Sequence, residues 1–354
     1  MSWHLRDSMV QCFPTMETQL DYSDILIVPR HSSVNSRSEV NLMRVNMGRI
    51  PWSGVPIVAA NMATIGTLEM AEALAKSMWL TCLHKHYTAA EILSLSRDGQ
   101  YFSAPTIGLD NISRETFRQV MEKQNDFKFV CIDVANGYID NFSELVYNIR
   151  REYGDRVNII AGNVVTPEGV RLLCKAGADF IKVGIGPGSA CTTRKMTGVG
   201  FPQFSAVQMC VREARQIPGM SGIVADGGCV HPGDVSKAFA AGAQMVMLGG
   251  MLAGHDEAGG WEFDYTTNTM VPTFYGMASE HAMQTHYNQR NHYRAAEGKR
   301  VVIEAKGPVE NTVREIMGGV RSACTYVGAK NLDELSKNSS FIKVNRQYNT
   351  AFGD

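Results

Sequence analysis

Short apolar runs that alternate with amphipathic segments constrain the fold of this chain more than any other feature. About eight such runs, rich in β-branched residues, recur along the sequence. Each is apolar at nearly every position, which is typical of strands buried on both faces of a parallel sheet. They begin at Pro56, Thr81, Ala104, Phe129, Val157, Phe180, Ile223 and Met245.

The segments between these runs carry helical patterns and helix-start signals. An apolar stripe at Phe117, Val120 and Met121 predicts an amphipathic helix. Thr166-Pro167 and His231-Pro232 each predict an N-cap followed by proline at the first helical position. About eight β–α alternations in one chain predict a (β/α)8 or TIM barrel, with a doubly wound sheet as the alternative.

The length and composition suit a single domain of this kind. The chain has 354 residues, of which 44% are hydrophobic and 19% are charged. No linker or repeat indicates a second domain. We therefore expect a catalytic barrel over 20–345, preceded by an N-terminal extension over 1–19 and followed by a polar tail over 346–354.

Charge, hydropathy and cysteine usage exclude several classes of partner. The formal net charge is -1 and no basic block is present, so we expect no nucleic-acid partner. The first residues have no apolar secretory core, and no run is long enough to span a bilayer. The 8 cysteines form no CxxC pair, which favours reduced thiols and a cytoplasmic location.

One cysteine lies in a setting unlike the others. The segment Gly184–Gln203 reads GIGPGSACTTRKMTGVGFPQ and follows the predicted sixth strand, where a TIM barrel places its active site. Cys191 lies in this polar, glycine-rich loop, beside Arg194, Lys195 and backbone amides that can stabilise a thiolate. Cys191 is thus a candidate nucleophile, and an inert packed thiol is the competing interpretation.

Two glycine pairs predict a phosphate site. Gly227-Gly228 and Gly249-Gly250 follow the predicted seventh and eighth strands. TIM barrels commonly hold phosphate between these two loops, where glycine lets backbone amides approach an anion. Asp226 precedes the first pair and can accept hydrogen bonds from ribose hydroxyls, although it can also cap a helix. The alternative is that all four glycines only form turns.

Other polar residues leave their roles open. His84-Lys85-His86 ends the second strand and suggests a zinc site, but no further ligands cluster near it in the sequence. Lys85 can instead reach a phosphate or a nicotinamide. Asp133 and Asn136 end the fourth strand, either as site residues or as polar residues at a barrel rim. No GxGxxG motif opens a βα unit, so a nicotinamide cofactor would not bind as in a Rossmann fold.

The full ordered set of motifs resembles the IMP dehydrogenase/GMP reductase family. The resemblance extends from Leu20 to about Val344. It rests on LDYSDILIVP, HKHY, DVANGY, AGNV, GPGSACTTRKMTGVGFPQ, ADGG, MLGGMLAGH, YGMAS, YRAAEGK and GGVRSACTYVGA. It implies a TIM barrel.

Three features favour the reductase branch of this family. The segment HKHYTAAEILSLSRDGQYFSAPT leaves no space for the regulatory domain that dehydrogenases usually insert between the second and third strands. The flap YGMASEHAMQTHYNQRNHYRAAEGK shows no Arg-Tyr pair to activate water, and CTTRKMTGVG with Lys195 is similar to reductases. The resemblance therefore implies NADPH-dependent reductive deamination of GMP to IMP and ammonia, through a cysteine thioimidate.

The resemblance also implies roles for individual residues. Cys191 would attack purine C2, while Thr193 and Glu297 would relay a proton to the departing amine. The GMP site would comprise Ser189, Asp226, Gly227, Gly228, Gly249, Gly250, Gly276, Met277, Ala278, Arg294 and Gly298. NADPH contacts would come from Lys85, Asp133, Val134, Ala135, Ile185, Gly186 and Tyr293, and across a subunit boundary from Ser36, Arg37, Ser322, Ala323, Cys324 and Thr325.

A monovalent cation, K+, and a homotetramer complete what the resemblance implies. The cation would be held by carbonyls of Gly186, Gly188 and Cys191, with Arg194. Three alternatives stay open. They are an IMP dehydrogenase that forms XMP with NAD, an FMN-dependent TIM-barrel oxidoreductase, and a nucleotide-binding protein without catalysis.

Overall fold

A computed structural model describes residues 17–345 and 347, except 124 and 288–294. Its central sheet is a closed barrel of parallel strands. The order is β6-β5-β4-β12-β11-β10-β9-β8-β7, and the two end strands, β6 and β7, flank Pro105 in the chain. The ring therefore closes, and β6 with β7 forms the third of eight barrel strands. This closure confirms the predicted TIM barrel and excludes the doubly wound sheet.

The barrel strands coincide with the predicted apolar runs. Their bounds are β4 (Ile57–Ala59), β5 (Leu80–Cys82), β6 (Ser103–Ala104), β7 (Thr106–Ile107), β8 (Phe129–Asp133), β9 (Asn158–Val164), β10 (Phe180–Val183), β11 (Gly222–Asp226) and β12 (Met245–Leu248). Pro105 divides the third strand because proline has no amide hydrogen to donate to a ladder. Its carbonyl still accepts a hydrogen bond from the amide of Cys131 at 2.9 Å.

Successive strand residues alternate between two hydrophobic cores. On β8, Phe129 and Cys131 belong to the core inside the barrel, whereas Val130 and Ile132 belong to the core under the helices. On β12, Met247 points inward in the same way. Both faces of each strand are thus apolar, which is why the sequence shows continuous runs rather than alternation.

Helices surround the barrel, and α6 and α9 begin where the sequence predicts. Thr166 caps α6 by accepting a hydrogen bond from the amide of Gly169 at 3.3 Å, and His231 occupies the N-cap of α9. The predicted stripe on α4 is buried. The helices on the outside are α1 (Leu68–Ala75), α2 (Ala89–Leu93), α3 (Arg97–Tyr101), α4 (Asn111–Met121), α5 (Asp140–Tyr153), α6 (Pro167–Ala176), α8 (Gln203–Ala214), α9 (Pro232–Ala240), α11 (Val309–Tyr326) and α12 (Leu332–Asn338).

The connection between the second and third strands holds only two short helices. β5 ends at Cys82 and β6 begins at Ser103, with α2 and α3 between them. The structure therefore has no inserted domain at this point, as the sequence predicts. Among the described residues, no helix combines the length and apolar character that a bilayer crossing needs.

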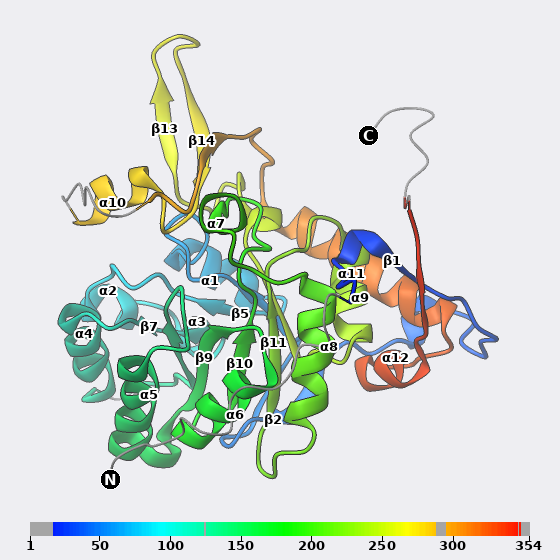
Figure 1. Ribbon diagram of the computed structural model, residues 1–354. Coiled ribbons are helices and arrows are strands. Elements are labelled where there is room, and N and C mark those ends of the chain that lie inside the picture. Colours follow the sequence, from blue (N-terminus) through cyan, green and yellow to red (C-terminus); the bar gives the residue numbers. More distant parts are fainter. Residues whose placement is uncertain (1–16, 124, 288–294, 346, 348–354) are drawn as a thin grey trace.

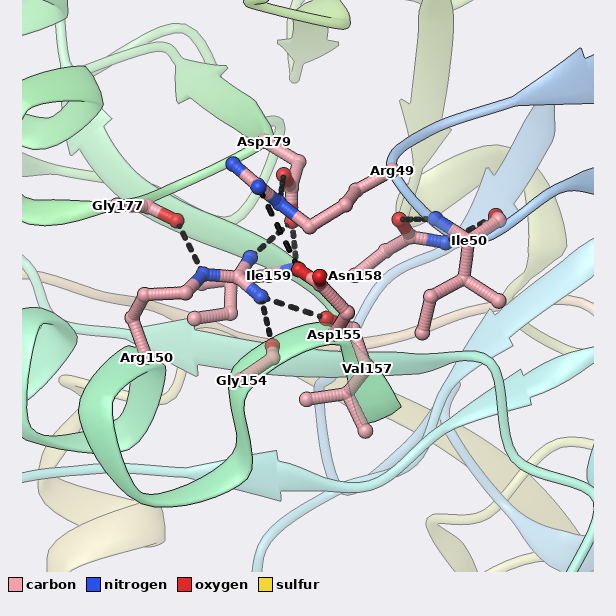
Figure 2. Close-up of polar contacts among 10 residues, drawn as sticks. All are labelled: Arg49, Ile50, Arg150, Gly154, Asp155, Val157, Asn158, Ile159, Gly177 and Asp179. Carbon is pink, nitrogen blue, oxygen red and sulfur yellow. Dashed lines mark hydrogen bonds and ion pairs between the residues drawn. The ribbon is translucent and has the colours of Figure 1, made fainter.

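An ion network closes the amino-terminal end of the barrel (Figure 2). Asp179 has a fully buried carboxylate that pairs with Arg150 and with Nε of Arg49 at 3.1 Å, and it accepts a hydrogen bond from the amide of Ile159 at 2.8 Å. Arg49 belongs to the turn between β2 (Arg44–Met47) and β3 (Trp52–Gly54). The network thus fastens this hairpin and α5 to the barrel. In TIM barrels, this end usually contributes to stability rather than to ligand binding.

Several outlying elements are absent from the sequence prediction. The chain after β12 forms an antiparallel sheet, whose hairpin projects from the barrel in yellow in Figure 1. The first strand pairs with the last, which joins the two ends of the described chain. These elements are β1 (Ile25–Ile27), β13 (Trp261–Asp264), β14 (Thr269–Tyr275), β15 (Arg300–Val302), β16 (Phe341–Lys343), α7 (Thr193–Thr197), α10 (Glu280–Tyr287), η1 (Tyr22–Asp24), η2 (Arg37–Glu39), η3 (Gly154–Arg156) and η4 (Gly250–Leu252).

Candidate active site

A cavity of about 250 Å³ lies at the carboxyl ends of the barrel strands. Most residues that the sequence singles out line this one cavity. They are Asp133, Val134, Ala135, Ile185, Gly186, Gly188, Ser189, Cys191, Thr193, Asp226, Gly227, Gly228, Gly249, Gly250, Gly276, Met277, Ala278 and Glu297. Gly298 adjoins it through a backbone bridge to Cys191. Tyr293 and Arg294 lie outside the described residues.

A chain of three side chains runs along one wall of the cavity. The Cys191 thiol donates a hydrogen bond to Oγ1 of Thr193 at 3.2 Å, and the Thr193 hydroxyl donates to Oε2 of Glu297 at 2.8 Å. The hydroxyl therefore accepts from the thiol and donates to the carboxylate at the same time. Such a chain can move a proton between sulfur and carboxylate without moving the backbone.

Backbone hydrogen bonds hold Glu297 beside the cysteine loop. The amide of Thr192 donates to the carbonyl of Glu297 at 2.9 Å, and the amide of Lys299 donates to the carbonyl of Ala190 at 2.9 Å. The amide of Glu297 in turn donates to the carbonyl of Ala278 at 3.0 Å. Main-chain contacts on both sides thus fix a carboxylate that is more than a hundred residues away in the sequence.

A second thiol at the cavity is a poorer nucleophile. Cys229 also lines the cavity, but burial raises the pKa of its thiol well above the usual value, with a further contribution from Asp234. Burial likewise raises the pKa of Cys324 to about 12. Cys191 is half-buried and is the thiol bonded into the Thr193–Glu297 chain. The geometry therefore favours the nucleophile over the inert thiol at Cys191.

The loops after β10, β11 and β12 meet at the glycine pairs. Gly227 and Gly228 have φ of +87° and +84°, a conformation that residues with a Cβ rarely adopt. A Cβ on Gly250 would lie 2.4 Å from Oγ of Ser189, so a larger residue there would force this hydroxyl to turn away. The three loops thus bring main-chain groups and one hydroxyl to the same end of the cavity, an arrangement that suits an anion.

The cavity floor carries a charged cluster that the sequence prediction missed. Nζ of Lys182 contacts Oδ1 of Asp133, and it lies 3.3 Å from Oδ2 of Asp226 and 3.3 Å from Oδ1 of Asn61. Asn163 donates from Nδ2 to Oδ2 of Asp226 at 2.8 Å. The available signal was a lysine inside the otherwise apolar run FIKV, because a buried charge needs partners.

Two opposing effects act on the Lys182 ammonium. Burial alone would lower the pKa of Lys182, but the carboxylates of Asp133 and Asp226 more than offset it, and the pKa is raised well above the usual value. The two carboxylates therefore favour the charged form of this buried amine.

Lys85 lies beside the cavity rather than in its lining. Its Nζ pairs with Oδ2 of Asp110 at 2.8 Å. Burial tends to raise the pKa of Asp110, but hydrogen bonds from Lys85 and the amide of Ser113 lower it to about 2.

The ring of His84 stacks on Tyr87 with centroids 3.9 Å apart. Within the described part of the chain, no group of three or more His, Cys, Asp or Glu residues could hold a metal ion.

The proposed cation ligands lie on the cysteine loop. The carbonyl of Gly188 accepts a hydrogen bond from the amide of Cys191 at 2.9 Å, which uses one of its two lone pairs. The guanidinium of Arg194 pairs with Asp21 and donates to the carbonyl of Phe201. Because a guanidinium carries only donors, Arg194 can serve a cation only through its own carbonyl.

The six residues implied at a subunit boundary lie outside the cavity. Ser36 caps η2, which begins at Arg37 and packs against α11, the helix that carries Ser322 to Thr325. The structure thus brings the two groups together, and none of their residues lines the cavity. The Cys324 side chain is fully buried in the core, so it offers no surface to a ligand of this chain.

Known proteins resemble this chain over nearly its whole length. Residues 19–349 match the family model described as IMP dehydrogenase / GMP reductase domain. A GMP reductase from Phytophthora infestans is 49% identical over 356 residues, covering 96% of this chain and 95% of that protein. GMP reductase 2 from Homo sapiens is 48% identical over 344 residues, covering 96% and 98%. A GMP reductase from Klebsiella pneumoniae is 49% identical over 343 residues, covering 95% and 98%. The chain therefore belongs to the IMP dehydrogenase/GMP reductase family.

Proposed function

We propose that this protein converts GMP to IMP and ammonia, using NADPH as the reductant. The observation that carries the proposal is the chain from the Cys191 thiol through Thr193 to Glu297. It lies beside three glycine-containing loops that suit the phosphate of a nucleotide. Relatives that are almost half identical to this chain over at least 95% of their lengths bear the name GMP reductase, which supports the same assignment.

The cavity offers a place for each part of GMP. Ser189 and the glycine pairs would hold the phosphate, and Asp226 would accept hydrogen bonds from the ribose hydroxyls. Met62, Phe274 and Met277 form an apolar part of the lining that suits a flat purine. The Met277 sulfur accepts a hydrogen bond from the amide of Ala63 at 3.3 Å, which fixes this side chain.

The first half of the reaction exchanges the amine for sulfur. The Cys191 sulfur bonds to purine C2, and its proton passes through the Thr193 hydroxyl to Glu297. Glu297 returns the proton through Thr193 to the amine, and the C2–N bond breaks with its electron pair leaving on ammonia. GMP and the thiol thus give ammonia and a thioimidate at Cys191. General acid catalysis of this kind contributes on the order of 10²–10⁴-fold.

The residues of the same cavity fit the reductant. The cavity that contains Cys191 is also lined by Asp133, Val134, Ala135, Ile185 and Gly186. A nicotinamide held by these residues would therefore share the cavity with a purine whose C2 lies at Cys191. When bound, NADPH supplies the hydride that C2 needs to become the C2–H of IMP. The Cys191 thiolate then leaves with the electrons of the S–C2 bond and takes one proton from the solvent. The cavity must exclude water meanwhile, because water at C2 would give XMP.

A cation site and an assembly, which the sequence resemblance implies, also belong to the proposal. We include K+ in the proposal because the carbonyls of Gly186, Gly188 and Cys191 are oxygen donors on one loop, and carbonyl oxygens are ligands that K+ prefers. We also include a homotetramer, in which Ser36, Arg37 and the α11 residues would contact the dinucleotide bound to a neighbouring subunit. The cation site is tested by comparing activity in K+ with activity in a bulky organic cation. The assembly is tested by measuring the molar mass of the purified protein by light scattering.

A substrate comparison tests the main proposal. Purified protein is incubated with GMP and NADPH, and separately with IMP and NAD, while nucleotide products and ammonia are measured. We expect IMP and ammonia in equal amounts from the first mixture. XMP from the second mixture, with no turnover of GMP, would identify a dehydrogenase instead. A yellow protein that releases FMN on denaturation, or one that binds GMP and turns over neither mixture, would support the remaining alternatives.

A further inference from the structure

Lys182 is a buried cation that lies between two carboxylates of the cavity. Only 2% of its surface is exposed, and it belongs to β10, between β9 and β11 in the ring. Its ammonium reaches Asp133 at the end of β8 and Asp226 at the end of β11. One ammonium therefore joins strands on either side of its own.

Only one of the two carboxylate oxygens of Asp226 is contacted by Lys182 and Asn163. Lys182 and Nδ2 of Asn163 both approach Oδ2, at 3.3 Å and 2.8 Å. Asn163 is itself fixed because Nδ2 also donates to the carbonyl of Gly184 at 2.7 Å. The described residues supply no hydrogen-bond donor to Oδ1 of Asp226. One oxygen thus anchors the carboxylate, and the other remains for a ligand in the cavity.

Asp133 shows the same division. Its Oδ1 contacts Lys182, and the described residues supply no donor to its Oδ2. In the proposed function Asp226 faces the ribose of GMP and Asp133 faces the dinucleotide. The ammonium of Lys182 therefore contacts and positions two carboxylates that would bind different ligands.

The cost of burying Lys182 argues for a role beyond packing. An apolar side chain would fill the same volume without desolvating an ammonium. Without the ammonium, two carboxylates would share a partly buried site, and repulsion would favour protonation of one of them. The other titratable groups near Lys182 are the thiols of Cys131 and Cys82, and a thiol cannot carry the positive charge of an ammonium.

We propose that Lys182 is a positioning residue whose ammonium holds Asp226 and Asp133 in place, with each carboxylate aimed at its own ligand. The proposal rests on the proposed function for the identity of those ligands. It adds a residue that touches neither reacting atom but sets the affinity for both substrates.

Steady-state kinetics of Lys182→Met tests this role. We expect KM for GMP and for NADPH each to rise by about tenfold or more, while kcat at saturation changes less. KM for GMP in the variant should fall as pH rises, because a higher pH restores the ionised carboxylate. The wild type should show no such trend over the same range. Lys182→Arg should recover part of the affinity, and Lys76→Met, an exposed lysine on the outer helices, is the matched control.

Calorimetric binding of GMP separates this proposal from the proposed function, because it needs no turnover. The double variant Lys182→Met/Asp133→Asn lacks one charge of each sign. Its GMP affinity should therefore lose the pH dependence expected of Lys182→Met alone. Equal GMP affinity and equal pH dependence in the wild type and in Lys182→Met would overturn the proposal, whatever the activity assays give. If Lys182→Met does not fold, the comparison is made with Lys182→Gln. An Asp226→Asn protein that binds GMP as tightly as the wild type would also count against it.

Discussion

Nη1 of Arg194 lies 2.8 Å from Oδ2 of Asp21, although 173 residues separate the two in the chain. The other carboxylate oxygen, Oδ1, accepts hydrogen bonds from Nη2 of Arg194 at 3.2 Å and from the amide of Gln203 at 2.6 Å. Asp21 therefore holds both ends of the exposed segment that follows Cys191. A residue that precedes η1 and β1 thus supports the loop that carries the candidate nucleophile.

Asp21→Asn should impair catalysis more than stability. The amide keeps one acceptor for Gln203 but loses the charge that orients Arg194, so the cysteine loop becomes less ordered. We expect kcat to fall by about tenfold or more, because small misplacement of a reacting group is costly. Turnover of GMP and the alkylation rate of Cys191 are the measurements, with Glu144→Gln on α5 as the control. An unchanged kcat would show that the loop keeps its position without Asp21.

Cys191→Ala should abolish turnover while GMP still binds. Removal of the sulfur eliminates the covalent step but leaves the glycine loops and Asp226 in place. Calorimetry measures the binding, and product analysis measures the turnover. Cys174→Ala, which removes a half-buried thiol on α6, should leave both unchanged. Repeated turnover by Cys191→Ala would remove this thiol from the mechanism.

Glu297→Gln should impair deamination more than hydride transfer. The glutamine amide can still hydrogen-bond to Thr193, but it cannot supply a proton, so loss of ammonia should slow by about 10²-fold or more. Rapid-quench measurement of ammonia release and of NADPH oxidation separates the two steps. Thr193→Ala, which interrupts the same chain, should resemble it. Equal slowing of both steps would argue against a proton role for Glu297.

Asp179→Ala should destabilise the barrel without changing the chemistry. It leaves Arg150 and Arg49 without their carboxylate at the closed end of the barrel, and loss of one partner of a buried pair costs about 3–5 kcal/mol. Urea unfolding measures the loss. The kcat of the folded fraction should match the wild type, because the network lies at the opposite end from the cavity. A loss below about 1 kcal/mol would show that the arginines find other partners.

The free energy of unfolding should depend on pH through His255. Burial lowers the pKa of this imidazole below its usual 6.5, while its Nδ1 lies 2.9 Å from the Gly307 carbonyl. The unfolded chain therefore binds the proton more tightly, and stability falls as pH drops below about 6.5. The slope should approach, at most, about 1.4 kcal/mol per pH unit. Urea unfolding between about pH 7.5 and about pH 5.5 should show a smaller slope in His255→Asn.

The sequence predicts the barrel well because its evidence is local. Continuous apolar runs and helix caps such as Thr166 depend on neighbouring residues, and the barrel strands and helix starts appear where these patterns place them. The break at Pro105 was not predicted, because the pattern from Ala104 was interpreted as one run. What the pattern did not reveal is that the two halves of this strand would pair with different neighbours.

The site was only partly predictable for the opposite reason. Thr193 and Glu297 are 104 residues apart, and no periodicity links them, so their pairing came from the resemblance alone. Lys182 and the Asp21–Arg194 pair escaped notice because long-range contacts leave only an isolated charge in a local pattern. The β13–β15 sheet was missed because its strands are half-exposed and lack the apolar runs of the barrel.

The ring of barrel strands has one further consequence. A closed ring offers no edge strand, so another chain cannot lengthen it by adding backbone hydrogen bonds. Within the described residues, unpaired strand edges belong only to small outlying sheets, such as β13 and β15 on either side of β14. Copies of this protein that associate must therefore meet through side chains on helices and loops or through these short edges, and the barrel that carries the cavity is protected from strand exchange.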